Sequence, residues 1–573
     1  MPVVSTFRSG PHRTAVGATA GLLAAFVALA VAELVAGLVR PAAGPVTVVG
    51  GALIDRTPPP VKDFAVRTFG EDDKTVLRLG ILAVLALFAA ALGIIALRRR
   101  WAGPGGVLLF GFIGAVAAAS RPDAQGAGDV LPSLAGAAAG ALALLVMREQ
   151  AVRGATAQDA AGGTDGPDSS GEGAGGGATG GGQNRRGFLV AAGVTAAVVT
   201  TGGLLGRYVS GHRARGAVAS REGLVLPAPA SPAPPVPRGV SLPVPGISPY
   251  TTRNADFYRV DTALVVPKVD AGAWRLRIRG KGVPRPRTFG LDDLLARPLI
   301  ERDITLTCVS NEVGGPYAGN ARWLGVRLDD LLAECGVVPP SRGGAADQLV
   351  ARSVDGMTLG SPVEDVMDGR DAMLAVGMNG EPLPFDHGFP VRMLVPGLYG
   401  YVSACKWIED IELTTFDAYD PYWVERKWAR RAPVKTQSRI DTPKPFARIP
   451  AGTVTVAGVA WAQHRGITRV QIRVDDGPWQ DADLAVQNTT DTWRQWSHRW
   501  PAAPGGHRIT VRATDATGRV QTERRAPTVP DGATGRHSVF VTVTQTTGSA
   551  WRRPEQHHPS LAEQVIHPYK EKS

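Results

Sequence analysis

The stretch from Ile304 to Trp323 reads ITLTCVSNEVGGPYAGNARW. Its first residues are rich in β-branched side chains, which predicts a short strand, and the glycines that follow predict a loop. One cysteine, Cys308, therefore lies at the end of the predicted strand, where the polar loop begins. A thiolate in that position suits a soft metal, but a lone cysteine on a strand is also commonly a small buried hydrophobic residue. This stretch alone leaves both interpretations open.

The chain has 573 residues and a formal net charge of +11. Its length accommodates two or three soluble domains in addition to membrane segments. A basic chain can bind nucleic acid, but much of the positive charge flanks apolar segments, as in Arg98-Arg99-Arg100 and Arg185-Arg186. Because membrane orientation places arginine at such positions, we expect a lipid bilayer as a partner and no nucleic acid.

The cysteines are few and widely spaced. Cys308, Cys335 and Cys405 form no CxxC or CxxCH motif, which excludes zinc-ribbon and c-type haem sites. A bridge between Cys335 and Cys405 is possible, but nothing in the sequence supports it. The chain is therefore not a disulfide scaffold.

Residues 1–150 are predicted to form a membrane domain with four transmembrane helices, at 15–39, 75–97, 103–119 and 131–147. A spanning helix needs about 20 apolar residues, so a buried helical hairpin is the alternative for the two shorter segments. Basic residues precede the first segment and follow the second and fourth. This pattern places the N-terminus and the end of the fourth helix in the cytoplasm.

Three connecting segments follow. Residues 151–184 are rich in glycine and predict a flexible linker. Residues 185–210 begin with Arg185-Arg186-Gly187-Phe188-Leu189 and continue as a weakly apolar run, which resembles a twin-arginine export signal at the start of a fifth transmembrane helix. An ordinary fifth span with basic flanks is the alternative. Residues 211–249 predict a proline-rich, semi-rigid spacer that holds the soluble part off the membrane.

The soluble part divides at a change of pattern. Residues 250–430 contain an alternating strand near 275–280, two short acidic-capped helices at 291–295 and 328–332, and turn-rich polar loops, which is typical of an α+β domain. Residues 431–548 contain short alternating strands near 453–461, 468–474, 492–500, 507–513 and 538–543. These strands predict an all-β sandwich, and residues 549–573 predict a loose tail.

Several blocks of residues 250–545 resemble the sulfite oxidase family of molybdenum-cofactor enzymes. The blocks are Leu306-Thr307-Cys308, Ala321-Arg322-Trp323 with Gly325, Asn379-Gly380 through Pro384, His387-Gly388-Phe389-Pro390-Val391-Arg392 and Lys406-Trp407. The resemblance implies an α+β sulfite-oxidase-like molybdopterin domain and an all-β immunoglobulin-like sandwich, which follow the multi-span α-helical membrane anchor predicted from the apolar segments. It also implies a molybdopterin-dependent oxidoreductase, and the predicted membrane topology places it on the extracytoplasmic face of the cell membrane.

The resemblance implies a role for each matched residue. Cys308 would be the catalytic residue and the thiolate ligand of molybdenum, beside the dithiolene of a pyranopterin. The other residues would bind the cofactor: His387, Arg392, Ser403 and Lys406 at its pterin or phosphate end, Asn254, Phe257 and Tyr258 from an N-terminal arm, and Asn320 and Arg322 along the same cavity. A buried phosphate needs paired cationic donors, which arginine and lysine supply.

The chain departs from the sulfite-oxidising branch of that family. Glu312 and Val313 stand after Asn311, and Tyr401 to Cys405 precede Lys406, where that branch has arginines. A carboxylate in the pocket would repel sulfite, so we expect oxygen-atom transfer with another small molecule, such as a sulfoxide or N-oxide. The alternatives are a genuine sulfite oxidase with a remodelled pocket and a non-catalytic membrane receptor with a β-sandwich binding domain.

The electron partner is open at this stage. No histidine occurs between His12 and His212, and a membrane b-type haem usually needs histidine ligands, so we predict no haem. The expected partner is an unknown electron carrier or a quinone-linked redox partner. A homodimer through the C-terminal domain is possible.

Overall fold

The fold is described from a computed structural model. It describes residues 11–57, 73–121, 126–161 and 215–545, together with residues 61, 68, 124, 193 and 211. Nearly all of the predicted fifth helix with its twin-arginine signal, most of the linker at 151–184 and the tail at 549–573 lie outside the described residues.

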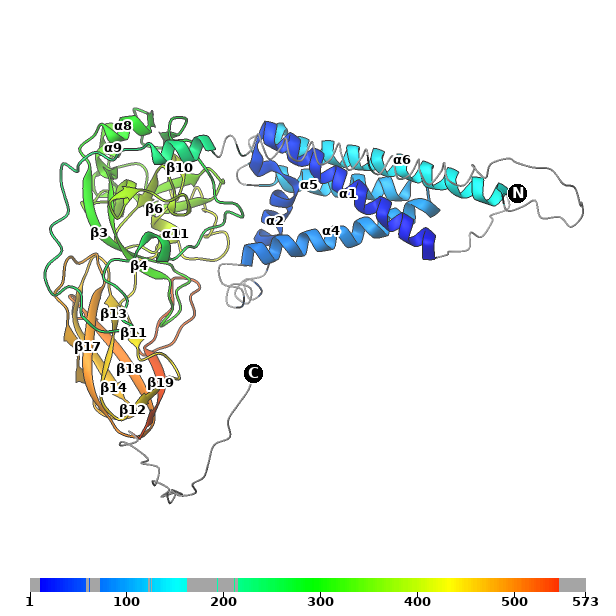
Figure 1. Cartoon of the computed structure of the whole chain (residues 1–573). Coiled ribbons are helices and arrows are strands. Elements are labelled where there is room, and N and C mark those ends of the chain that lie inside the picture. The colour runs from blue at the N-terminus through cyan, green and yellow to red at the C-terminus, as the bar shows by residue number, and fades with distance from the viewer. Residues whose placement is uncertain are drawn as a thin grey trace, which may run out of the picture.

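A bundle of helices forms the N-terminal part (Figure 1). Its elements are α1 (Pro11–Val39), η1 (Pro41–Ala43), α2 (Pro45–Arg56), α4 (Asp73–Arg98), α5 (Ala102–Ala119), η3 (Ala127–Val130) and α6 (Leu131–Ala161). Four of the described helices, α1, α4, α5 and α6, are long and apolar enough to cross a membrane. Two features differ from expectation: α2 was not predicted, and α6 continues to Ala161, so the first residues of the predicted linker are helical.

Small residues set the packing inside the bundle. A Cβ atom added at Gly21 of α1 would lie 1.9 Å from the carbonyl oxygen of Ala89 in α4. A Cβ added at Gly111 of α5 would lie 2.1 Å from the Cβ of Ala137 in α6. Such close approach of helix backbones through glycine and alanine is the usual packing mode of membrane helices.

The middle of the chain forms two sheets joined by short helices. One sheet has the order β2-β1-β10-β5-β6, and the other has the order β3-β4-β7-β8, with β9 paired to β7. The strands are β1 (Arg275–Gly280), β2 (Arg287–Gly290), β3 (Ile300–Thr307), β4 (Ala318–Arg327), β5 (Gln348–Ser353), β6 (Thr358–Pro362), β7 (Met373–Met378), β8 (Glu381–Pro382), β9 (Arg392–Leu394) and β10 (Ile408–Thr414). The helices are η4 (Asn254–Asp256), α8 (Leu291–Leu295), α9 (Leu328–Glu334), η5 (Pro340–Arg342), α10 (Val363–Val366), η6 (Phe385–His387) and α11 (Gly400–Ser403). The predicted strand near 275–280 and both predicted short helices are confirmed as β1, α8 and α9.

The C-terminal part forms two further sheets around one core. Their orders are β11-β13-β17-β16 and β12-β19-β18-β14-β15. The strands are β11 (Gln437–Thr442), β12 (Arg448–Pro450), β13 (Gly452–Trp461), β14 (Ile467–Val474), β15 (Gln480–Asp481), β16 (Asp483–Leu484), β17 (Arg494–Ala502), β18 (Gly505–Asp515) and β19 (His537–Thr544). Val456 and Trp496 of one sheet and Ile472 and Val541 of the other belong to the same buried cluster. The five strands predicted from alternation are therefore confirmed as β13, β14, β17, β18 and β19.

The proline-rich segment differs from the spacer that we expected. The backbone of Ser231 pairs with β3, where the N–H of Glu301 donates to the carbonyl of Ser231 at 2.9 Å. Further along, the N–H of Ser248 donates to the carboxylate of Asp441 in β11 at 2.9 Å. The segment thus lies against both soluble parts. It covers an exposed strand edge, which would otherwise be open to pairing.

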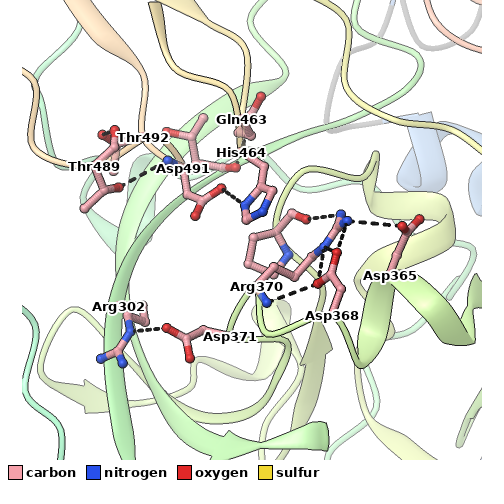
Figure 2. Close-up of polar contacts among 12 residues, drawn as sticks. Arg302, Asp365, Asp368, Arg370, Asp371, Gln463, His464, Thr489, Asp491 and Thr492 are labelled. Carbon is pink, nitrogen blue, oxygen red and sulfur yellow. Dashed lines mark hydrogen bonds and ion pairs between the residues drawn. The ribbon is translucent and has the colours of Figure 1, made fainter. Parts of the chain in front are cut away.

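The C-terminal part also holds β3, the strand that leads to Cys308. The N–H of Thr305 donates to the carbonyl of Asp491 at 2.9 Å. The amide of Gln463 donates to the carbonyl of Thr305 at 3.0 Å and to the hydroxyl of Thr307 at 2.9 Å. Figure 2 shows Gln463, His464 and Asp491 on loops that face Arg370 and Asp368 of the middle part. The position of β3 therefore depends on both parts.

Replacing Gln463 with leucine tests this support. The change leaves the carbonyl of Thr305 and the hydroxyl of Thr307 without this donor, and the loss of buried hydrogen bonds costs on the order of 2–3 kcal/mol. We expect a lower melting temperature of the full chain in a thermal unfolding experiment. Leucine at the exposed Gln480 is the control, and equal melting temperatures of the two variants would contradict the expectation.

Candidate active site

A cavity of about 130 Å³ opens where the two middle sheets meet their loops. We call it the central cavity. Its lining residues come from the segment before β1, the end of β3, the turn between β5 and β6, the loops around β9 and α11, and the segment after β10. They include Phe257, Tyr258, Asp261, Thr262, Cys308, Ser310, Asp355, His387, Arg392, Tyr401, Lys406, Trp423 and Trp428.

Cys308 stands at the end of β3, as the sequence predicts. Its N–H donates to the carbonyl of Tyr317 at 3.0 Å, and its carbonyl accepts from the N–H of Asn311 at 3.1 Å, which closes the turn after the strand. The residue is half-buried and lines the cavity, and its sulfur lies 2.8 Å from the hydroxyl oxygen of Ser310. Burial raises the pKa of this thiol, while Ser310 and Lys406 act in the opposite direction. The thiol is therefore protonated at neutral pH unless a cation binds to it.

Aromatic side chains form one wall of the central cavity. The ring of Phe257 stacks on Tyr258 at 5.2 Å and meets the edges of Trp323 and His387 at 5.8 and 5.5 Å. A Cβ added at Gly319 would lie 2.7 Å from the Phe257 ring, so glycine leaves the room that this ring needs. The wall provides a rigid apolar surface beside Cys308.

Cationic side chains lie next to this wall. Arg392 is 4% exposed; its Nη1 donates to the carbonyl of His387 at 3.1 Å, and its guanidinium lies 5.0 Å from the centre of the Trp323 ring. Burial lowers the pKa of Arg392 to about 10, so the guanidinium stays charged at neutral pH. The Nε atom of Arg392 is buried without a hydrogen-bond partner. An unpaired buried donor on a charged group is costly, which points to an anion as its missing partner.

Lys406 and His387 complete this side of the central cavity. The ammonium of Lys406 lies 3.0 Å from the carboxylate of Asp261 and donates to the carbonyl of Asp386 at 3.0 Å. Burial lowers the pKa of Lys406 to about 8, although Asp261 opposes the shift, so lysine is still mostly protonated at pH 7. Burial also lowers the pKa of His387 to about 4, and its Nε2 lies 3.0 Å from the carbonyl oxygen of Asn254. His387 is therefore neutral, and that ring nitrogen is a donor.

Four predicted binding residues do not line the central cavity. Asn320 is fully buried and bonds to Thr305 and Tyr250, and Ser403 is fully buried and donates to the carbonyls of Leu398 and Tyr399. Arg322 turns away to Asp303, with an ion pair of 2.8 Å. Asn254 reaches the site only through its backbone carbonyl, while its side chain bonds to Asn379 and Glu381.

The alternation of β4 explains this outcome for Asn320 and Arg322. Successive residues of a strand point to opposite faces. Gly319 and Trp323 face Phe257 and the cavity wall, so Asn320 and Arg322 point to the other face. The arginine of the Ala-Arg-Trp block is thus paired with Asp303 on the neighbouring strand, directly opposite it in the register of β3 and β4.

Glu312 does not place a carboxylate in the pocket, contrary to the expectation from the sequence. Glu312 is exposed, it does not line the central cavity, and its carbonyl accepts from the N–H of Gly315 in a turn. The carboxylates of the lining are Asp261 and Asp355 instead. The possible bridge between Cys335 and Cys405 is not formed either, because both are free thiols.

Other residues that line the central cavity were not predicted from the sequence. Asp261, Tyr401, Trp423 and Trp428 line it, and Tyr401 and Trp428 pack at 5.6 Å. Trp423 and Trp428 belong to a segment with little periodicity, which gives no signal of burial. Asp261 follows the predicted arm residues Phe257 and Tyr258 closely, so that arm could have been extended to include it.

Two histidines, the buried His387 and the half-buried His537, should make stability depend on pH below neutrality. Burial lowers the pKa of His387 and of His537 to about 4, whereas an unfolded histidine titrates near 6.5. Because the histidine pKa is lower in the folded than in the unfolded protein, its contribution to the free energy of unfolding is complete above about pH 6.5. This contribution is lost as the pH falls toward 4. His537 accepts the N–H of Ile440 at 3.0 Å and packs on Gly314 in the loop after Cys308.

We expect His537→Gln to flatten the pH dependence of the melting temperature between pH 6.5 and 4.5. The contribution of this histidine is on the order of 3 kcal/mol. Replacing the half-buried His498 with glutamine is the control. An unchanged slope in His537→Gln would contradict the assignment.

Comparison with known proteins identifies the class. The family described as "Oxidoreductase molybdopterin binding domain" matches residues 263–423, which include Cys308, Arg392 and Lys406. The mitochondrial sulfite oxidase of Mus musculus is 30% identical over 321 residues, covering 48% of this chain and 58% of that protein. The sulfite oxidase of Gallus gallus is 30% identical over 324 residues, covering 48% of this chain and 69% of that protein. The chain thus spans 58% of the length of the mouse relative.

Similarity extends to solved structures. The sulfane dehydrogenase SoxCD from Paracoccus pantotrophus is 25% identical, with a TM-score of 0.45, covering 52% of this chain and 82% of that one.

The fold and the central cavity define an oxidoreductase with a molybdopterin-binding domain. More particularly, the chain belongs to the sulfite oxidase family. That family implies a molybdenum–molybdopterin cofactor, a small-molecule substrate and an electron carrier.

The central cavity fits such a cofactor. The unpaired Nε of Arg392 could donate a hydrogen bond to an anion, and the phosphate of the cofactor would be that anion. Within the part of the chain that the structure describes, no group of three or more His, Cys, Asp and Glu side chains is placed to hold a metal ion.

Proposed function

We propose that Cys308 is the thiolate ligand of a molybdenum–pyranopterin cofactor in the central cavity. When bound, the cofactor would supply a metal that accepts or donates an oxygen atom. The positive metal would keep Cys308 deprotonated in spite of its burial. Arg392, Lys406 and the neutral His387 would bind the anionic end, and Phe257 and Tyr258 would exclude water from one side.

We propose that the substrate is a neutral oxide, such as a sulfoxide or N-oxide, which the enzyme reduces. The supporting observation is the charge of the cavity lining. Among its residues, all of which lie in the described part of the chain, the cations are Arg392 and Lys406, and Lys406 already faces Asp261. Tyr401, Trp423 and Trp428 also line the cavity, and its lining offers no further cation to a dianion such as sulfite.

Steady-state kinetics on the purified, cofactor-loaded full chain tests this proposal. We expect reduction of a dialkyl sulfoxide or an amine N-oxide, with a reduced viologen as donor, to exceed sulfite oxidation by at least about tenfold in kcat/KM. A genuine sulfite oxidase is the second candidate, and its support is the identity to animal sulfite oxidases. Efficient sulfite oxidation would establish that candidate and refute the neutral oxide.

The helical bundle is proposed to anchor the enzyme in the cell membrane, with the catalytic part outside. The charge pattern of the sequence places the end of α1 and the start of α4 on the outer side. The catalytic part touches the bundle at this end, where Arg78 of α4 donates to the carbonyl of Leu264. The predicted fifth helix, with or without a twin-arginine signal, would return the chain to the outer side. This topology is consistent with that contact.

Other expectations from the sequence remain proposals. The two C-terminal sheets are proposed to form an immunoglobulin-like sandwich and to offer a surface for a homodimer. The bundle is proposed to work without haem, since no histidine occurs between His12 and His212. The receptor alternative has lost its support, because the chain belongs to an oxidoreductase family.

A further inference from the structure

The bundle contains a second cavity, of about 600 Å³, between α1, α2, α4, α5 and α6. We call it the bundle cavity. Its lining is apolar, and Ser133 of α6 has the one polar side chain among the described lining residues. Several apolar side chains on its rim are exposed, among them Val84 at 51% and Phe88 at 51%. Such a cavity is open to the hydrocarbon layer of a bilayer and admits a long apolar molecule from the side.

Ser133 marks a polar contact point inside the bundle cavity. Its residue is 3% exposed, and its hydroxyl oxygen is buried without a hydrogen-bond partner. The hydroxyl faces Gly114 of α5, where an added Cβ would lie 2.7 Å from the oxygen. An unsatisfied hydroxyl in apolar surroundings costs free energy, so a ligand with a carbonyl or hydroxyl group is favoured over one with hydrocarbon alone.

A short piece of chain separates the two cavities. Thr262 lines the central cavity, and two residues later Leu264 packs on α2, where a Cβ added at Gly50 would lie 2.8 Å from Leu264 Cδ2. The carbonyl of Leu264 accepts from Arg78, beside Leu77 of α4, which lines the bundle cavity. In Figure 1 the bundle meets the catalytic part at this end. A redox-active ligand in the bundle cavity would therefore lie close to the site of oxygen-atom transfer.

We propose that the bundle cavity binds an isoprenoid quinone, which is the electron carrier of this enzyme. Its ring would accept a hydrogen bond from Ser133, and its isoprenoid chain would extend past the apolar rim into the bilayer. The oxidoreductase needs a carrier, and the sequence has no histidine between His12, at the start of α1, and His212, so the bundle helices offer no pair of histidine ligands for a haem. Among apolar molecules of a bilayer, a quinone combines a long apolar chain with a polar ring and carries two electrons.

The redox balance rests on the proposed reduction of a neutral oxide. A quinol loses two electrons and two protons and becomes the quinone. The oxide takes up two electrons and two protons, its bond to oxygen breaks, and the oxygen leaves as water. One quinol is consumed for each oxide reduced, so no additional reductant is needed.

The test measures binding and does not depend on turnover. The purified full chain is incubated with a short-chain menaquinone and phosphatidylethanolamine in mixed micelles, and unbound material is removed by gel filtration. Extraction and chromatography then give the amounts of quinone and phospholipid retained per chain. We expect about one quinone per chain in the native protein.

Three variants locate the quinone. Gly80 of α4 lines the bundle cavity, and a Cβ there would meet no atom within 4 Å, so Gly80→Leu fills space without a clash. We expect it to weaken quinone binding at least about tenfold, and Ser133→Ala, which preserves the fold, to weaken it about fivefold. Gly105→Leu in α5 is the matched control, because an added Cβ there also meets no atom and this residue does not line the cavity.

Quinone binding that is unchanged in both Gly80→Leu and Ser133→Ala would overturn the proposal, as would retention of phospholipid alone. The two proposals fail in different ways. Quinone binding without oxide reduction would refute the proposed substrate and leave the quinone site in place. Oxide reduction with a viologen as donor, but without quinone binding, would refute the quinone site and leave the proposed substrate in place.

Discussion

Cys308→Ser is expected to lower oxide reduction by at least about 1,000-fold in kcat, which corresponds to about 4 kcal/mol of lost transition-state stabilisation. Serine keeps the size of the side chain, but a hydroxyl is a poor replacement for a thiolate on a soft metal. Arg392, Lys406 and His387 are unchanged, so the variant should still retain the pterin. The experiment measures kcat together with the molybdenum and pterin content of each preparation.

The matched control for this variant is Cys335→Ala. Cys335 is fully buried at the end of α9 and does not line the central cavity. Its replacement should cost stability and leave kcat nearly unchanged. Equal losses of kcat in the two variants, or full activity of Cys308→Ser with bound molybdenum, would show that the sulfur of Cys308 has no special role.

Arg392→Gln is expected to abolish stable retention of the cofactor. Removing one partner of a buried charge pair costs about 3–5 kcal/mol, which weakens binding by a factor of about 150 to 4,000. The guanidinium has an unpaired Nε in the central cavity, and that donor is the one that the cofactor phosphate would satisfy. The readout is pterin and phosphate per chain after gel filtration, measured on protein made under identical conditions.

Arg322→Gln separates this role from a general need for arginine. Arg322 pairs with Asp303 on the far face of β4, so we expect a lower melting temperature with normal cofactor content. Asn488 also donates to Asp303 at 2.8 Å, which limits the damage. Loss of cofactor in Arg322→Gln with retention in Arg392→Gln would reverse the assignment and restore the role that the sequence resemblance gives to Arg322.

The strands and short helices could be predicted because their sequences carry local signals. Residues 507–513 alternate between apolar and polar side chains, and β18 follows them. The acidic pairs at Asp292-Asp293 and Asp329-Asp330 stand in the first turns of α8 and α9, where they favour the helix dipole. Cys308 could be placed at a strand end for the same reason.

The differences between the sequence-based expectations and the structure come from long-range contacts. The pairing of β3 with β4 places Asp303 beside Arg322, and the two side chains form an ion pair. The alternation of side chains along β4 alone was sufficient to place Arg322 on the other face of the strand from Trp323. The proline-rich segment looked like a spacer because proline disfavours regular structure, but Ser231 pairs with the edge of β3, and no local signal reports that edge. Glu312 is turned outward by its loop, and sequence spacing cannot indicate the direction of a loop side chain.

X-ray absorption at the molybdenum edge tests the central claim most directly. The measurement counts the sulfur atoms bound to the metal in the purified full chain and in Cys308→Ser. The account predicts one sulfur ligand beyond the pair that the dithiolene supplies, and the loss of that one ligand in the variant. The same number of sulfur ligands in both proteins would contradict it.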